Sequence, residues 1–195
     1  GGDRPIRIQG HPWSDDGRKI LIFTNGKRVW RMETRGDYWV LDLDSWELKK
    51  LGGDAKEPAL FFGKFSPAGD RVAYVRESDI YIQDVKTLAV TRLTKDGSKT
   101  RINGTTDWVN EEEFHLRDGF RFSPDGALVA YWQFDTEGVR EFHLIDNTGD
   151  LYPRISSFAY PKAGERNSAC RVGVVPAAGG ETLWIDLPGD PRDHY

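Results

Sequence analysis

Three consecutive glutamates, Glu111, Glu112 and Glu113, are the side chains of this sequence most suited to binding chemistry. They lie between aromatic residues in the run DWVNEEEF, residues 107–114. Carboxylates beside aromatic rings are partly desolvated and attract a positive charge more strongly than solvated ones. An organic ammonium carries three N–H donors, which two carboxylates can accept in charge-assisted hydrogen bonds. The run therefore predicts an ammonium site, the alternative being an ordinary solvated acidic face.

A short helix is expected to carry these glutamates. Asp107 precedes them and is a favourable N-cap residue. Successive side chains on a helix are about 100° apart, so two of the three glutamates can share one side while the third turns away.

Other catalytic chemistries lack their residues. There is no Gly-x-Ser-x-Gly elbow, no patterned calcium loop, and only one cysteine, Cys170. We expect neither a metal nor a cofactor. The four histidines have no evident serine partner and are expected to be structural or superficial; they are His11, His115, His143 and His194.

Composition excludes two further classes of function. The 195 residues include 27 Lys and Arg against 31 Asp and Glu, a net charge of −4, without a basic cluster. Nucleic acid and anionic membrane surfaces are therefore not expected as partners. No stretch approaches the roughly 18 apolar residues of a membrane span. A hydrophobic share of 38% is compatible with a folded globular domain.

A repeat supplies the elements that must position the glutamates. An aromatic residue, a Ser-x-x-Gly turn and a β-branched strand recur three times, with the turn glycines Gly17, Gly69 and Gly126 spaced 52 and 57 residues apart. This spacing is slightly longer than that of familiar propeller blades. We predict an all-β fold, a partial β-propeller of about three to four four-stranded antiparallel blades. The expected blade units are residues 13–50, 60–100, 115–150 and part of a further blade at 165–190.

The details of the third unit follow from the same repeat. Residues 141–146 are expected to form its third strand, and residues 169–175 and 182–187 to begin a fourth blade. Two segments interrupt the pattern. One is the glutamate run, a short helical insertion; the other, residues 150–164, contains two prolines and is expected to be an extended arm.

Three motifs now resemble a known family. They are DWVNEEE at 107–113, FSPDG at 122–126 followed by AYWQFDT at 130–136, and YPKAG at 160–164. In this order they resemble the N-terminal propeller of the dipeptidyl peptidase IV family, within the prolyl oligopeptidase superfamily of serine peptidases, especially its bacterial members. The resemblance implies that residues 1–195 are a fragment of an eight-bladed propeller, with the catalytic α/β-hydrolase domain absent from this chain. It implies removal of N-terminal dipeptides whose second residue is proline or alanine.

The resemblance also implies roles for individual residues. Glu112 and Glu113 would hold the substrate's free α-ammonium, with Glu111 in support. Arg31, in the pair Trp30-Arg31, would contact the glutamates and a substrate carbonyl. The arm from Asn147 to Gly164 would contribute to a homodimer. The family often has Tyr where this sequence has Asn110.

Two other functions remain open at this stage. The propeller could belong to a non-catalytic protein that binds a peptide or protein partner, or to a related peptidase that removes tripeptides or acylated residues. In the peptidase interpretation this chain alone would be inactive, and a periplasmic or secreted location is favoured.

Overall fold

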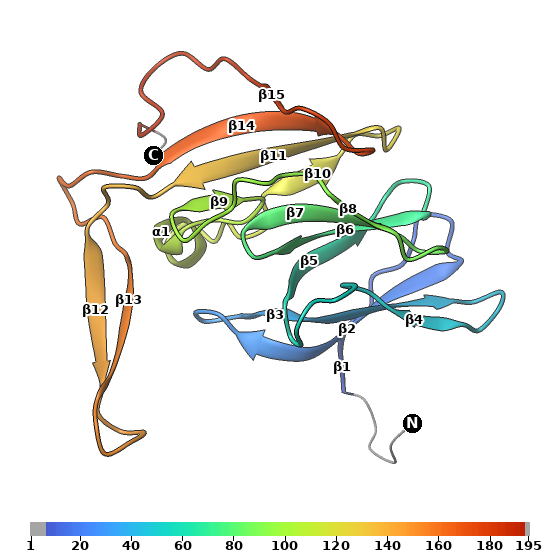
Figure 1. The fold of residues 1–195 in the computed structure, drawn as a ribbon, viewed down its shortest axis with the longest axis horizontal. Helices are drawn as coiled ribbons and strands as arrows, with labels where there is room; N and C mark the ends of the chain where they lie inside the picture. Colours follow the sequence, from blue (N-terminus) through green and yellow to red (C-terminus); the bar gives the residue numbers. More distant parts are fainter. Residues whose placement is uncertain (1–6, 194–195) are drawn as a thin grey trace.

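The computed structural model describes residues 7–193, which form three antiparallel blades lying side by side and one separate hairpin (Figure 1). A short strand pairing joins the first two blades into one eight-stranded sheet. The first blade contains β1 (Ile8–Gly10), β2 (Lys19–Arg28), β3 (Glu33–Asp42) and β4 (Leu48–Lys50). The second contains β5 (Leu60–Phe65), β6 (Arg71–Arg76), β7 (Asp79–Asp84) and β8 (Val90–Arg92). The third contains β9 (Arg101–Asn103), β10 (Phe120–Phe122), β11 (Leu128–Asp135), β14 (Ala169–Pro176) and β15 (Leu183–Trp184). The predicted all-β partial propeller is confirmed, and the described sheets do not close into a ring.

The repeated turn has one hydrogen-bond pattern in all three blades. The serine hydroxyl accepts from the amide five residues later, at 2.9 Å in Ser14–Lys19, 3.1 Å in Ser66–Arg71 and 2.9 Å in Ser123–Leu128. The turn glycines have φ values of +68°, +67° and +69°, a conformation that side-chain-bearing residues rarely adopt. This local chemistry explains why the sequence repeat predicts strand boundaries so well.

Side chains that alternate between the two faces of the middle blade contribute to two hydrophobic cores. Val72 and Tyr74 of β6 pack between the first and second blades, whereas Ala73 and Val75 pack between the second and third. Side chains of a strand point alternately to opposite faces, so β6 is covered on both. The blades thus stabilise one another, and the stack is continuous.

The third blade differs from its expected strand order. We expected residues 141–146 as its third strand, but these form β12 (Glu141–Asp146), which pairs with β13 (Arg154–Ala159) instead of β11. The partner of β11 is β14, along eight residues. The expectations for 141–146 and for a fourth blade beginning at 169 were therefore wrong. The physical difference is burial: all six residues of β12 are exposed, a property that its alternating sequence does not reveal.

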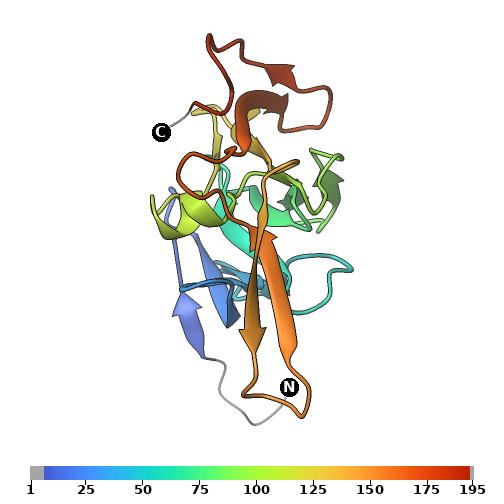
Figure 2. The same ribbon diagram turned by 90° about the vertical axis from the view of Figure 1, so that its left-hand side faces the viewer.

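The β12–β13 hairpin, which we call the arm, leaves the third blade between β11 and β14 and runs along the side of the stack toward the first blade (Figures 1 and 2). It forms a separate two-stranded sheet. In Figure 1 it extends at the left down past the level of the first blade. A free two-stranded hairpin is marginally stable in water, so its contacts at the root are important.

A second excursion, the helical insertion (residues 104–119), interrupts one strand position of the third blade. β9 and β10 both pair with β11, at its two ends, and the insertion leaves between them. Its two ends meet where the Gly119 amide donates to the Gly104 carbonyl at 3.0 Å, and both glycines hydrogen-bond the backbone of Trp132. A Cβ at Gly119 would lie 1.7 Å from the Trp132 indole nitrogen, so this close approach requires glycine.

No helix within residues 7–193 has the length and apolar character needed to cross a bilayer. The one helix described, α1 (Trp108–Glu112), has five residues and lies in the insertion.

Candidate functional site

Helix α1 begins at the predicted N-cap. The Asp107 carboxylate accepts from the Asn110 amide nitrogen at 3.1 Å and from its side-chain nitrogen at 2.7 Å. Its second oxygen accepts from the Ser168 hydroxyl at 2.6 Å. Asp107, Asn110 and Ser168 are all buried. The acidic segment is therefore anchored both at its own start and to the chain just before β14.

Arg31 and Glu112 meet directly, although 81 residues separate them. The Arg31 Nε lies 2.5 Å from Glu112 Oε2, and the Arg31 backbone amide donates to Glu112 Oε1 at 3.3 Å. The Glu112 side chain is only 3% exposed, whereas that of Arg31 is 69% exposed. The carboxylate is thus held firmly, and much of the guanidinium remains accessible to a ligand.

The other two glutamates occupy different surroundings. Glu111 is buried, and desolvation raises the pKa of its carboxyl, with Arg117 opposing this shift and Glu112 adding to it. Its Oε1 lies 3.7 Å from Arg117 Nε without a hydrogen bond. Glu113 caps the end of α1 and is exposed. Glu111 and Glu112 are thus both buried, facing Arg117 and Arg31 respectively, whereas Glu113 is exposed.

Arg117 was not predicted as part of this group. It follows α1 after a turn in which His115 has a positive φ of +58°, and no spacing rule in the sequence indicates that the chain reverses there.

Five aromatic side chains pack together beside the start of α1; this aromatic cluster comprises Trp30, Trp108, Phe142, Phe158 and Tyr160. Trp30 precedes Arg31, and Trp108 is the first residue of α1. Phe158 contacts both, with ring centroids 4.8 Å from Trp30 and 5.6 Å from Trp108. A pocket of about 450 Å³ lies beside the three rings at the root of the arm. Trp108, one of the aromatic residues expected beside the glutamates, thus packs against the arm, whereas Phe114, on their other side, is 48% exposed.

A half-buried lysine supports the end of the insertion. Lys64 of β5 donates to Asp118 at 2.5 Å and to the Phe120 carbonyl at 2.8 Å. Burial lowers the pKa of Lys64 to about 8, against the opposing effect of Asp118. This contact joins the second blade to the insertion that carries the glutamates.

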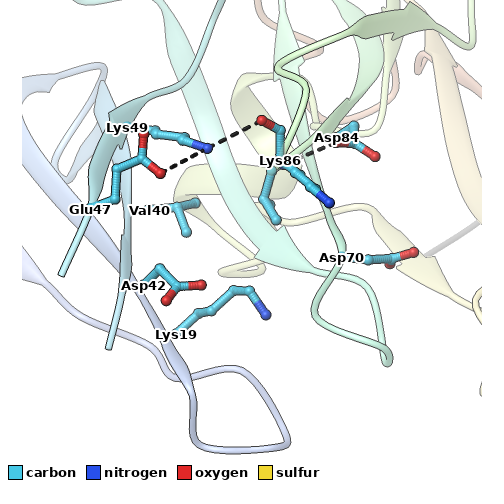
Figure 3. Close-up of a pocket in the computed structure, with 9 residues that line it drawn as sticks. Lys19, Val40, Asp42, Glu47, Lys49, Asp70, Asp84 and Lys86 are labelled. Carbon is cyan, nitrogen blue, oxygen red and sulfur yellow. Dashed lines mark hydrogen bonds and ion pairs between the residues drawn. The ribbon is translucent and has the colours of Figure 1, made fainter. Parts of the chain in front are cut away.

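A second pocket, of about 420 Å³, lies at the opposite ends of β2 and β3 from Arg31 (Figure 3). It is lined by four acidic and three basic residues with two valines. Its acids are engaged in turns: hydrogen bonds from Ser45 and Thr87 lower the pKa of Asp42 and Asp84 respectively. Lys49 donates to the Lys86 carbonyl at 3.1 Å. The acidic groups are thus already occupied by local turn contacts, so the pocket is a weaker candidate than the Arg31–Glu112 site.

Metal ligation has no candidate in the described residues, because no group of three or more His, Cys, Asp or Glu side chains gathers there suitably. His194 lies outside the described residues.

The blades and the inserted helix define a class: an antiparallel β-propeller domain that presents a carboxylate–guanidinium site between two strand connections. Residues 14–195 match the family described as dipeptidyl peptidase IV (DPP IV) N-terminal region. The chain belongs to this family.

Individual relatives agree with this assignment. Dipeptidyl aminopeptidase B of Saccharomyces cerevisiae is 32% identical over 96% of this chain and 23% of its own length. A probable dipeptidyl-aminopeptidase B of Podospora anserina is 31% identical over 92% of this chain and 21% of its own length. The crystal structure of Porphyromonas gingivalis dipeptidyl peptidase 4 superposes with a TM-score of 0.89 at 31% identity, over 97% of this chain and 27% of that one. The chain spans about a fifth to a quarter of the length of these relatives.

Proposed function

We propose that this chain is the substrate-recognition part of a serine-type dipeptidyl peptidase that removes X-Pro and X-Ala dipeptides from peptide N-termini. The proposal includes completion of an eight-bladed propeller and an α/β-hydrolase domain that supplies the nucleophile. The propeller fragment itself is non-catalytic and inactive alone. Family membership supports the peptidase class.

The observation that carries the proposal is the Arg31–Glu112 contact. The resemblance to the family assigned both residues to one site, and Arg31 Nε lies 2.5 Å from Glu112 Oε2 in the fold. Arg31 holds one edge of the Glu112 carboxylate, and Glu113 adds a second negative charge at the exposed end of α1. Two carboxylates and a guanidinium suit a peptide N-terminus, whose ammonium donates hydrogen bonds and whose first carbonyl accepts one.

An anchor of this kind fixes the distance between the substrate's N-terminus and the bond that is cleaved. If the ammonium is fixed at Glu112 and Glu113, the second peptide bond reaches a nucleophile at a constant distance, which restricts cleavage to dipeptides. A blocked amine lacks the charge that the glutamates receive, so it is excluded from the site.

The arm gives the proposed homodimer surface, from Asn147 to Gly164. Support comes from exposed apolar side chains: Leu151 is 92% exposed, Tyr152 78% and Ile155 65%. Apolar side chains grouped on a projecting hairpin are typical of interaction sites.

Hydrolysis of a Gly-Pro chromogenic substrate by the full-length protein tests the function, with the N-acetylated substrate as the control. Cleavage of the free-amine form alone is expected. Equal cleavage of both forms would refute the ammonium anchor, and a folded protein that cleaves neither would favour a non-catalytic binding propeller.

A further inference from the structure

The arm contacts both segments whose charges meet at the site. Phe158 of β13 packs against Trp30, the neighbour of Arg31, and against Trp108, the first residue of α1. Tyr160, at the end of the arm, packs on Trp108 with ring centroids 4.4 Å apart. One side chain of the arm therefore bridges the β2–β3 connection and the helical insertion.

These two segments come from different blades and need a common support. Arg31 lies in the connection between β2 and β3 of the first blade, a turn in which the Val29 amide donates to the Met32 carbonyl at 3.0 Å. Met32 is 51% exposed, so this turn projects into solvent. Glu112 lies in an insertion of the third blade. Ring contacts on Phe158 restrict both segments next to the charged pair.

We propose that the arm is a positioning element for the ammonium site, acting through Phe158 on the geometry of the Arg31–Glu112 pair. This inference rests on the proposed function of that pair. Phe158 does not touch substrate; it holds Trp30 and Trp108 at a fixed separation, and the charged side chains follow. A site assembled from two blades loses affinity when its two halves are no longer held together, because ordering them then costs free energy on binding.

The surroundings of Phe158 favour a clean test. Its ring is half-buried, and the pocket of about 450 Å³ opens beside it. Its cross-strand partner Phe142 is 39% exposed. Neither ring belongs to the two cores between the blades, so truncation of Phe158 is expected to leave the blades folded.

The experiment measures kcat and KM of the full-length protein on the free-amine Gly-Pro substrate. Phe158→Ala is expected to raise KM about ten-fold with kcat within about two-fold, from two lost ring contacts. Phe158→Tyr keeps the ring and should restore KM. His143→Ala is the matched control, because it breaks the neighbouring cross-strand contact, His143 Nδ1 to Ser157 Oγ at 2.7 Å, without touching the aromatic cluster.

A double-mutant cycle with Glu112→Gln decides whether Phe158 acts through the charged pair. If it does, adding Phe158→Ala to Glu112→Gln should lower kcat/KM little further, because the Glu112 carboxylate that Phe158 positions is already absent. Full additivity, a wild-type KM for Phe158→Ala, or an equal loss for His143→Ala would overturn the inference. These results leave the proposed function intact provided that Glu112→Gln alone impairs the enzyme. A Glu112→Gln variant with wild-type kinetics would refute both.

Discussion

Glu112→Gln is the most direct perturbation of the proposed site. The substitution keeps the size of the side chain and an oxygen that can accept from the Arg31 amide, a contact of 3.3 Å. It removes the negative charge that faces Arg31 Nε at 2.5 Å. Since the Glu112 side chain is 3% exposed, water cannot readily replace what is lost.

The size of the effect follows from this burial. A hydrogen bond to a charged group contributes roughly 1.5–3 kcal/mol, which corresponds to about a 10- to 150-fold change in kcat/KM for the free-amine substrate. We expect a loss in this range for Glu112→Gln, and a loss of at least about ten-fold for Glu113→Gln when substrate desolvates that exposed carboxylate.

The assay compares kcat/KM for Gly-Pro substrates in the wild type and these variants. Glu165→Gln is the control, since Glu165 is exposed and its ion pair with Arg140 spans 3.5 Å at the surface, where such pairs contribute little. Wild-type kinetics for Glu112→Gln would show that the buried carboxylate does not bind the ammonium.

Three further predictions concern stability and reactivity. Asp79 is fully buried and accepts hydrogen bonds from Thr94, Gly97 and Asn103. Asp79→Ala should therefore destabilise the propeller by about 3–5 kcal/mol, which lowers its thermal midpoint by on the order of 10 °C. Circular dichroism measures the midpoint, and an unchanged value would contradict the prediction. The pKa of Lys64 falls to about 8 in the fold, so between pH 8 and 10.5 the unfolded chain binds more protons than the folded one. The free energy of unfolding of the wild type, measured by denaturant titration relative to Lys64→Met, should therefore rise with pH across that window. A difference between the two proteins that does not change with pH would exclude the shift. Burial raises the pKa of Cys170 to about 11, so its thiol should resist alkylation at pH 8 until denaturant is added, and rapid labelling of the native protein would refute this.

The blade repeat was predictable because its signals are local. Each turn glycine needs a positive φ, and each serine closes its own turn, so the sequence marks the first two strands of every unit without reference to distant residues. The helix start was equally accessible, because Asp107 caps a helix that begins at the next residue.

The third strand of the third blade was not predictable in this way. Residues 141–146 and 169–176 both have the residue pattern of a blade strand. Which of the two pairs with β11 depends on which one the folded blade buries, and the sequence pattern does not show this. The link from Glu111 to Arg117 was missed for a similar reason, since it depends on a chain reversal within the insertion. The Arg31–Glu112 contact was expected only by resemblance, because no local rule joins residues 81 positions apart.

The closure of the helical insertion at Gly104 and Gly119 has an evolutionary consequence. Because β9 and β10 are each fixed on β11, the strand pairing of the blade does not involve the intervening residues, which touch the blades chiefly where Asp107 meets Ser168 and Asp118 meets Lys64. Changes in the length or sequence of that segment can alter ligand preference while the scaffold stays the same. Diversification of specificity in such a propeller is therefore separable from the maintenance of its fold, with the two glycines and Trp132 as the boundary that must be kept.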